Sequence, residues 1–232
     1  MHADGAPMWP RSVAELVEAQ RALADAEPPR WRPLAELAFL AVGAVAICFP
    51  RGMSGPGARG DRAWAAVAVM RGRRTLAEAT AVGEAGAPYE AGLLALREGP
   101  LLEAAVRALH ENPDVLLVDA TGRDHPRRGG MALHLGAVLD LPTVGVTHRP
   151  LLAEGEWPAK PKGEAAPLVL DGEQVGARVR RRAGVRPVTA HPAWRTDIET
   201  AVAVVLRTAG SHRTPEPLRR ARRLARLARA EG

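Results

Sequence analysis

The chain has 232 residues, of which 47% are hydrophobic and 25% charged, a length and composition that fit one globular domain, with or without appendages, and allow a buried core. Cys48 is the only cysteine, which excludes an internal disulfide and fits a reducing cytoplasm. The net charge of +6 is concentrated in residues 211–232, where seven arginines face two acids. This segment is expected either to attract phosphates or to form a solvated helix face.

The sequence gives no sign of a secretion signal or a membrane span. The first 30 residues contain no apolar run. The apolar stretch over 37–49 has 13 residues, too few to cross a bilayer, and is typical of a buried strand. We therefore expect a cytoplasmic protein without membrane association, and a monomer.

The first part of the chain predicts a helix followed by three strands. Ser12 and Glu15 have the spacing of a helix N-terminal capping box, and prolines 28, 29 and 33 predict a stiff connector after that helix. Short links between the strands favour an antiparallel meander. The expected elements are a helix over 11–26, strands over 37–49, 63–70 and 76–82, a mobile loop over 51–62 and a tight turn over 71–74.

The second part alternates helices and strands, which predicts parallel pairing with right-handed crossovers. An Asp171-Gly172 turn indicates a hairpin. The expected helices cover 90–110, 128–138, 194–208 and 215–230, and the expected strands cover 114–119, 142–147, 168–170, 175–179 and 187–190.

The order of these elements predicts the fold class. A meander followed by β/α units gives an α/β, ribonuclease H-like fold, with a mixed sheet and helices on both faces. We expect an N-terminal helix and connector over 1–33, a catalytic-type domain over 34–210, and an Arg-rich helix over 211–232 that packs on the domain or extends from it.

The stretch 115–128 carries the strongest chemical signal. A buried strand ends in Asp119, a turn containing Gly122 follows, and then come His125, Arg127 and Arg128. This pattern places a metal-binding carboxylate beside phosphate-binding groups at the carboxyl end of a strand. Taken alone, Asp119 is equally well explained as a cap of the next helix.

Four segments in matching order and spacing resolve this choice. Residues 88–98 contain Pro-Tyr followed by Arg-Glu, and 119–128 contain an Asp and a late His-Pro-Arg-Arg. Residues 141–146 read Leu-Pro-Thr-Val-Gly-Val, and 214–219 read Thr-Pro-Glu-Pro-Leu-Arg. Together they resemble the endonuclease V family of deoxyinosine-directed DNA repair nucleases, over roughly residues 13 to 225.

The resemblance implies Mg²⁺- or Mn²⁺-dependent hydrolysis of a phosphodiester near an extruded hypoxanthine base, with DNA or RNA as the bound partner. Asp119 and Glu98 would hold the metal, and His191 would complete the catalytic set. Tyr89 would fill the gap left by the base, and Gly122 would allow close approach of the backbone. The residues expected to meet phosphate are His125, Arg127, Arg128 and His148.

Several positions depart from the family pattern. Val45 stands where the family has its first metal-binding Asp, and no acid lies between Glu36 and Asp61 to replace it. A valine has no lone pair to offer a hard cation, so metal binding is expected to be weakened. His148 replaces a lysine, Ala120-Thr121 replaces Gly-His, and Ala91 replaces a proline.

Two main hypotheses follow. The protein is an endonuclease V-like DNA repair hydrolase with a depleted metal site, or it is an inactive relative that binds nucleic acid or a partner protein. A remodelled pocket for another phosphorylated substrate is a third. Structural roles also stay open for Glu98 as a surface acid, His191 as a packing residue and Tyr89 as a core-edge residue, while Asp124 is a candidate substitute ligand.

Overall fold

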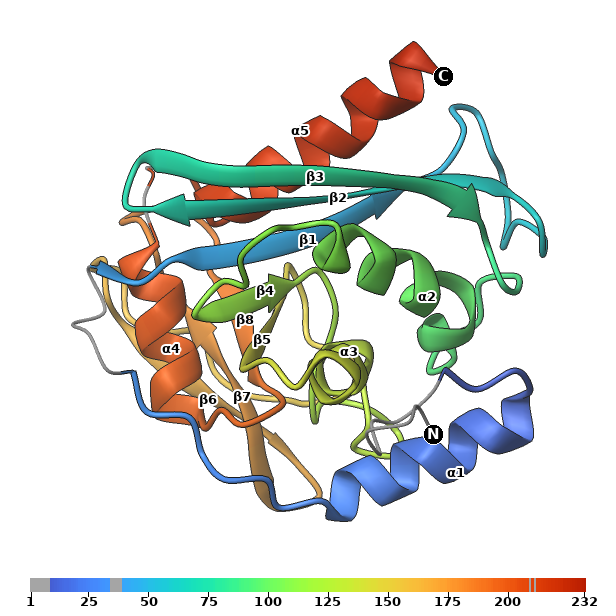
Figure 1. The fold of residues 1–232 in the computed structure, drawn as a ribbon. Helices are drawn as coiled ribbons and strands as arrows, with labels where there is room; N and C mark the ends of the chain where they lie inside the picture. The colour runs from blue at the N-terminus through green and yellow to red at the C-terminus, as the bar shows by residue number, and fades with distance from the viewer. Residues whose placement is uncertain (1–8, 34–38, 209, 211) are drawn as a thin grey trace.

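The computed structural model describes residues 9–33, 39–208, 210 and 212–232. Within them a single eight-stranded mixed sheet carries helices on both faces (Figure 1). Its strands are β1 (Val42–Cys48), β2 (Arg62–Arg71), β3 (Arg74–Glu84), β4 (Val115–Val118), β5 (Thr143–Thr147), β6 (Ala165–Leu170), β7 (Glu173–Val179) and β8 (Val188–Pro192). The helices are α1 (Val13–Asp25), α2 (Leu94–Arg107), α3 (Met131–Leu139), α4 (Ile198–Arg207) and α5 (Glu216–Glu231).

The strand order is β3-β2-β1-β4-β5-β8-β7-β6. Strands β1, β2 and β3 pair antiparallel, which confirms the predicted meander. Strand β4 pairs parallel with both β1 and β5, as expected of β/α units. The remaining strands, β8, β7 and β6, are antiparallel to their neighbours, so the far edge of the sheet is a second antiparallel block.

Some element boundaries differ from the sequence-based expectation. The strand expected over 37–49 begins at Val42, and residues 37 and 38 lie outside the described part. The helix expected from residue 194 begins only at Ile198, because Asp197 caps it by accepting the backbone N–H of Thr200 (2.9 Å). In α1 the predicted cap is present, since Ser12 accepts the backbone N–H of Glu15 (3.2 Å).

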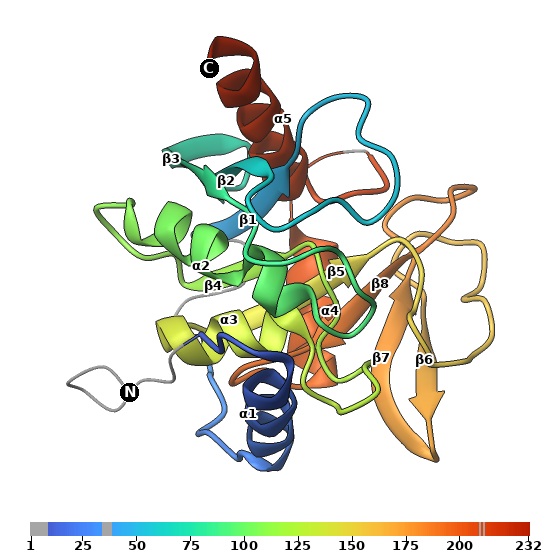
Figure 2. The same cartoon turned by 90° about the vertical axis from the view of Figure 1, so that its right-hand side faces the viewer.

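The alternation of side chains along the central strands builds two cores. Val45 faces the cluster formed with helices α1, α2 and α3, whereas its neighbour Ala44 faces the cluster formed with α4. Figure 2 shows α1, α2 and α3 gathered on one side of the sheet. None of the helices among the described residues is long and apolar enough to cross a bilayer.

Helix α5 packs across β1 and β2 through small side chains. Ala221 is fully buried against Ala46 and Ala68, and Leu218 and Ala225 are fully buried as well. Small residues let the helix lie close to the sheet, and its buried face fixes the direction of the arginines on its other faces. The Arg-rich segment is therefore attached to the fold.

Arg97 of α2 anchors the loop that joins β1 to β2. Its guanidinium stacks on Phe49, with 4.2 Å between the guanidinium carbon and the ring centroid. It also donates to the carbonyl of Ala58 (3.3 Å) and pairs with Asp61 (3.1 Å). The loop predicted to be mobile is thus tied to a buried side chain of the helix.

Candidate active site

The carboxyl end of β4 lies beside the middle of β1 and defines the candidate site. Val45 and Val118 are partners in the parallel register of these strands, and Asp119 follows directly after β4. Val45 is fully buried in the core formed with α1, α2 and α3. Asp119 is 37% exposed, because its side chain leaves the sheet toward α5.

The Asp119 carboxylate is held by Arg222 of α5. The Nε of Arg222 donates to Oδ2 (2.9 Å), and Nη2 donates to Oδ1 (2.7 Å). This two-point geometry is the strong form of an arginine–carboxylate pair. Both oxygens of the predicted metal ligand therefore accept hydrogen bonds from a fixed cation.

Glu98 approaches the same region from α2. Burial raises the pKa of its carboxyl to about 7, while the charge of Arg97 opposes the rise and that of Asp119 adds to it. The predicted second acid thus lies within electrostatic reach of Asp119. It can exist in either protonation state near neutral pH.

His191 lies on β8, beyond β5, and its side chain is fully buried. The hydroxyl of Thr147 donates to the carbonyl of Arg149 (2.6 Å), so it accepts from His191 Nε2 (2.9 Å). The Nδ1 atom lies 4.0 Å from Asp124 Oδ2. Burial lowers the pKa of His191 to about 4, with Asp124 opposing the shift, so the imidazole is neutral at pH 7.

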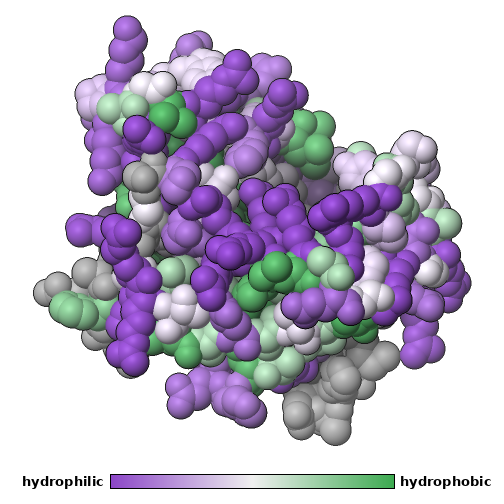
Figure 3. Space-filling model, turned by 90° about the horizontal axis from the view of Figure 1, so that it is seen from above, coloured by the Kyte–Doolittle hydropathy of each residue, from purple (hydrophilic) through white to green (hydrophobic). Residues whose placement is uncertain are grey.

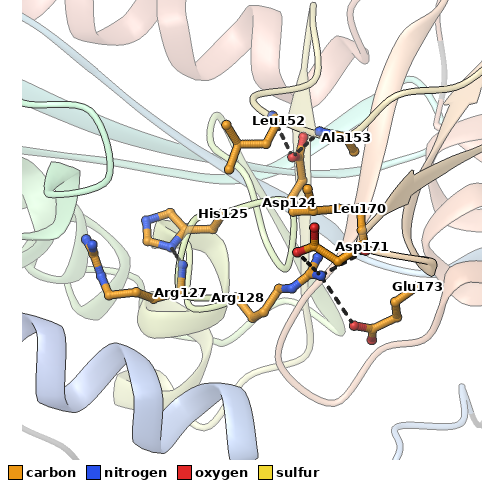
Figure 4. Close-up of polar contacts among 9 residues, drawn as sticks. All are labelled: Asp124, His125, Arg127, Arg128, Leu152, Ala153, Leu170, Asp171 and Glu173. Atoms are coloured by element: carbon orange, nitrogen blue, oxygen red, sulfur yellow. Dashed lines mark hydrogen bonds and ion pairs between the residues drawn. The ribbon is translucent and has the colours of Figure 1, made fainter.

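The side chain of Asp124 binds the backbone of the loop that follows β5. Its fully buried carboxylate accepts three backbone N–H groups at 2.7–2.9 Å, from Leu151, Leu152 and Ala153. Figure 4 shows the carboxylate turned toward Leu152 and Ala153. These bonds take up three of its roughly four acceptor sites, and among the described residues Asp124 belongs to no group of three or more side chains placed to hold a metal.

A pocket of about 140 Å³ is lined by Gln20 of α1 and by Ala120 and Thr121, which follow Asp119 in the chain. Tyr89, 54% exposed, stands at this pocket, whose other walls combine apolar side chains with a few hydroxyl and ring groups. Its main lining residues are Tyr89, Gly92, Leu94, Thr121, His125, Met131, Thr147 and Leu151.

His125 and Arg127 hold the wall of this pocket in place. Arg127 donates its backbone N–H to His125 Nδ1 (3.2 Å), which leaves Nε2 to donate to the carbonyl of Gly92 (3.2 Å). The Arg127 guanidinium and the Gln20 amide donate to the same carbonyl at 2.8 and 2.9 Å. Burial lowers the pKa of His125 to about 4. Gln20 had no sequence signal, because glutamine in a helix is usually an exposed residue.

Arg128 points away from this group, as Figure 4 shows. It donates to the carbonyl of Leu170 (2.8 Å) and pairs with Asp171 (3.1 Å) in the β6–β7 turn. The predicted phosphate-binding residues are therefore not all in one place. His125 and Arg127 lie by the pocket, and Arg128 lies by the β6–β7 hairpin.

The two other predicted residues lie at close backbone contacts. A Cβ on Gly122 would come 2.2 Å from the carbonyl oxygen of Pro192, so this glycine allows β8 to pack against the β4–α3 turn. His148 bonds to the hydroxyl of Thr214 through Nε2 (2.8 Å), joining the end of β5 to the start of α5. Burial lowers the pKa of His148, and the charges of Arg213 and Arg222 lower it further.

The comparisons with known proteins identify the family and the fold of this chain. The family model described as Endonuclease V matches residues 41–223. The chain belongs to the endonuclease V family. Endonuclease V of Streptomyces avermitilis is 44% identical over 72% of this chain and 74% of its own length. Its crystal structure has a TM-score of 0.83 and covers 96% of this chain and 95% of that one.

More distant endonuclease V proteins share the same fold. The catalytic domain of human endonuclease V is 29% identical, with a TM-score of 0.82 over 94% of this chain and 96% of that one. Endonuclease V of Ciona intestinalis, solved with a 24-mer DNA containing an inosine, is 20% identical, with a TM-score of 0.77 over 94% and 98%. The ribonuclease H-like fold of the present chain is thereby confirmed.

The endonuclease V family generally uses divalent metal ions, but the residues of this chain do not fit one. Val45 offers no donor, and both Asp119 oxygens accept from Arg222. Among the described residues, no group of three or more His, Cys, Asp or Glu side chains is placed to hold a metal. A hard cation requires several oxygen ligands, and here the positive guanidinium of Arg222 is already bound to the Asp119 carboxylate.

Proposed function

We propose that this endonuclease V-like protein recognises deoxyinosine in DNA and that its Mg²⁺- or Mn²⁺-dependent hydrolysis of the phosphodiester is weak or absent. The single observation that carries the proposal is the contrast between the base pocket and the predicted metal site. The pocket beside Tyr89 is formed and braced, whereas Asp119 is bound to Arg222.

The pocket supports recognition of a base. It is narrow and largely apolar, and its wall is fixed by three hydrogen bonds to the Gly92 carbonyl. An extruded base needs such a cavity, lined by surfaces for stacking and a few polar groups that read its edge. Tyr89 stands where an aromatic ring can stack on the neighbouring bases. The Ciona relative solved with inosine-containing DNA has the same fold.

The region around Asp119 argues against efficient hydrolysis. Metal-dependent cleavage needs an activated water and a cation that stabilises the charge developing on phosphate. Here a cation would have to displace Arg222 from Asp119 and bind without an oxygen donor from position 45. Residues that only hydrogen-bond to a metal ligand typically change metal affinity or activity by about 10- to 100-fold when they are lost. Losing a metal ligand itself should reduce them by more than this.

The test is a paired binding and cleavage assay on duplexes that differ in one base, inosine or guanine. We expect at least about fivefold tighter binding of the inosine duplex, because base readout contributes about 1–3 kcal/mol. We expect cleavage in millimolar Mg²⁺ or Mn²⁺ to be slow or undetectable. Equal affinity for the two duplexes would contradict the proposed recognition.

Metal-dependent cleavage through Asp119, Glu98 and His191 is the second candidate function. Asp119 keeps its place at the end of β4, and its charge acts on Glu98, which favours this reading. It requires Arg222 to leave Asp119 when the metal binds. Rapid cleavage by the native chain that disappears in Asp119→Ala would establish this function and contradict the first. Asp25→Ala, at an exposed position at the end of α1, is the control.

We further propose a cytoplasmic monomer whose nucleic-acid ligand is DNA, with RNA as the second choice. The same binding assay with an inosine-containing RNA duplex compares the two ligands, and light scattering reports the oligomeric state.

A further inference from the structure

We propose that the guanidinium of Arg222 takes the place of a divalent cation at Asp119 and binds a nucleic-acid phosphate directly. The inference rests on the proposed function only in taking nucleic acid as the ligand. It assigns phosphate binding to a residue that the sequence motifs did not single out.

The position of Arg222 is fixed from two sides. Its helix is held on the sheet by buried Ala221 and Ala225, so the side chain leaves α5 in a set direction, toward Asp119 at the end of β4. Asp119 then grips it at two points, at 2.7 and 2.9 Å. A cation held in this way needs little reorganisation when an anion arrives.

The guanidinium keeps donors for a ligand. Arginine has five N–H groups, and the bonds to Asp119 use the Nε–H and one Nη2–H. Among the described residues, Asp119 is the acid with which Arg222 forms an ion pair, and the Arg222 side chain is 25% exposed. The unused N–H groups suit two oxygens of a phosphate, which guanidinium binds in a fork geometry.

Arg222 is also the first member of a row along α5. Arg226 and Arg229 follow at four and seven positions, which puts all three on one side of the helix. Arg229 reaches the carbonyl of Phe49, just past β1, so the row runs from Asp119 to the end of β1. The face that carries α5 is covered mainly by hydrophilic side chains (Figure 3). A row of this kind follows a phosphodiester backbone.

Substituting a guanidinium for a metal changes the chemistry that the site supports. Arginine stays protonated at all physiological pH values and cannot lower the pKa of a bound water as a metal ion does. The site therefore holds a phosphate without generating the nucleophile for hydrolysis. Binding should need no divalent ion.

The experiment measures fluorescence anisotropy of labelled inosine and unmodified duplexes, in EDTA and in millimolar Mg²⁺. Native affinity should agree between the two conditions within about twofold, apart from the general effect of ionic strength. Arg222→Gln should weaken binding of both duplexes by about tenfold and reduce the salt slope by about one. The matched control is Arg223→Gln, an exposed neighbour off the row, for which we expect less than about a threefold change.

A double variant separates phosphate binding from simple charge repulsion, because Arg222→Gln alone leaves Asp119 unpaired. In Arg222→Gln with Asp119→Asn, both charges are gone, and we expect the affinity to stay low. Recovery of native affinity in this double variant would overturn the proposal. Thermal unfolding of each variant verifies that it is folded.

Two further outcomes bear on the proposal. If Mg²⁺ tightens native binding by more than about fivefold and Arg222→Gln increases this effect, Arg222 only shields an ion site and the proposal is wrong. If binding depends on Arg222 but does not distinguish inosine from guanine, the phosphate site stands and the proposed base recognition fails.

Discussion

Val45 and Val118 are register partners in the parallel pairing of β1 and β4, and both are buried in the same apolar cluster. The position where the family carries an acid is thus part of the hydrophobic core of this protein. Asp119, one residue beyond Val118, faces Arg222 instead of a second carboxylate. The two differences go together: position 45 lacks an acid to hold a metal ion, and the positive guanidinium of Arg222 binds Asp119 in its place.

Replacing this valine by an acid should destabilise the protein. Val45→Asp places a carboxyl group among apolar side chains, and we expect a loss of more than about 2 kcal/mol in the free energy of unfolding at pH 7. The loss should shrink at low pH, where the introduced carboxyl is protonated. Urea unfolding at pH 5 and pH 8 measures both effects, with Val45→Thr as a control of similar shape. Unchanged stability at pH 8 would show that position 45 is reached by water or by a cation.

His134 should make the protein sensitive to acid. Its buried ring stacks on Trp9 at 4.6 Å, and burial lowers its pKa from 6.5 to about 4. Neither of its ring nitrogens has a polar partner among the described residues. The unfolded chain therefore binds the proton more readily, so the stability that neutral His134 contributes is present above pH 6.5 and is lost as the pH falls toward 4.

The variant His134→Leu keeps the volume and removes the titration. We expect its free energy of unfolding to fall less steeply between pH 7 and pH 4 than that of the native chain, by up to about 3 kcal/mol. His125 and His191 have similarly lowered pKa values, so part of the acid sensitivity should persist. The exposed His110 provides the control His110→Leu. Parallel pH profiles for the native chain and His134→Leu would contradict this account.

Glu98 should act in the opposite direction. Burial raises its pKa from 4.5 to about 7, so the folded state favours the protonated carboxyl. Its contribution to stability is present below pH 4.5 and is lost as the pH rises through about 7. We expect Glu98→Gln to be more stable than the native chain at pH 8, by at most about 3 kcal/mol, and nearly equal at pH 4. Melting temperatures over this range, with exposed Glu90→Gln as the control, measure the difference.

Tyr89 should matter for binding and little for folding. Its ring is 54% exposed at the rim of the pocket. We expect Tyr89→Ala to weaken binding of the inosine duplex by about 5- to 150-fold, the range of base–aromatic stacking. Tyr89→Phe keeps the ring and should bind like the native chain. A loss of affinity in Tyr89→Phe equal to that in Tyr89→Ala would assign the effect to the hydroxyl rather than to stacking.

The sequence predicted the fold well because its signals are local. Alternation and turn residues mark the meander, and Asp171-Gly172 marks the β6–β7 hairpin. The helix was expected from residue 194, four residues before α4 begins at Ile198. There the backbone forms a turn, in which Ala193 donates its N–H to the Thr196 hydroxyl (2.9 Å).

The site was harder to predict, because its key contacts join distant segments. The pair of Asp119 and Arg222 spans 103 positions, and nothing in an Arg-rich tail marks one arginine as different from the rest. His125 and Arg127 were assigned to phosphate by pattern, but their partners in the structure are a backbone carbonyl and Gln20. Whether they also contact phosphate stays a prediction.

Arg97 links helix α2 to the loop between β1 and β2. It precedes Glu98 on α2, and the same guanidinium secures the long crossing between β1 and β2. A movement of this turn of α2 would therefore displace Glu98 and loosen the β1–β2 loop at the same time. Proteolysis at residues 51–58 would then report on the surroundings of Glu98, because cleavage of this loop should become faster when the contacts of Arg97 are lost.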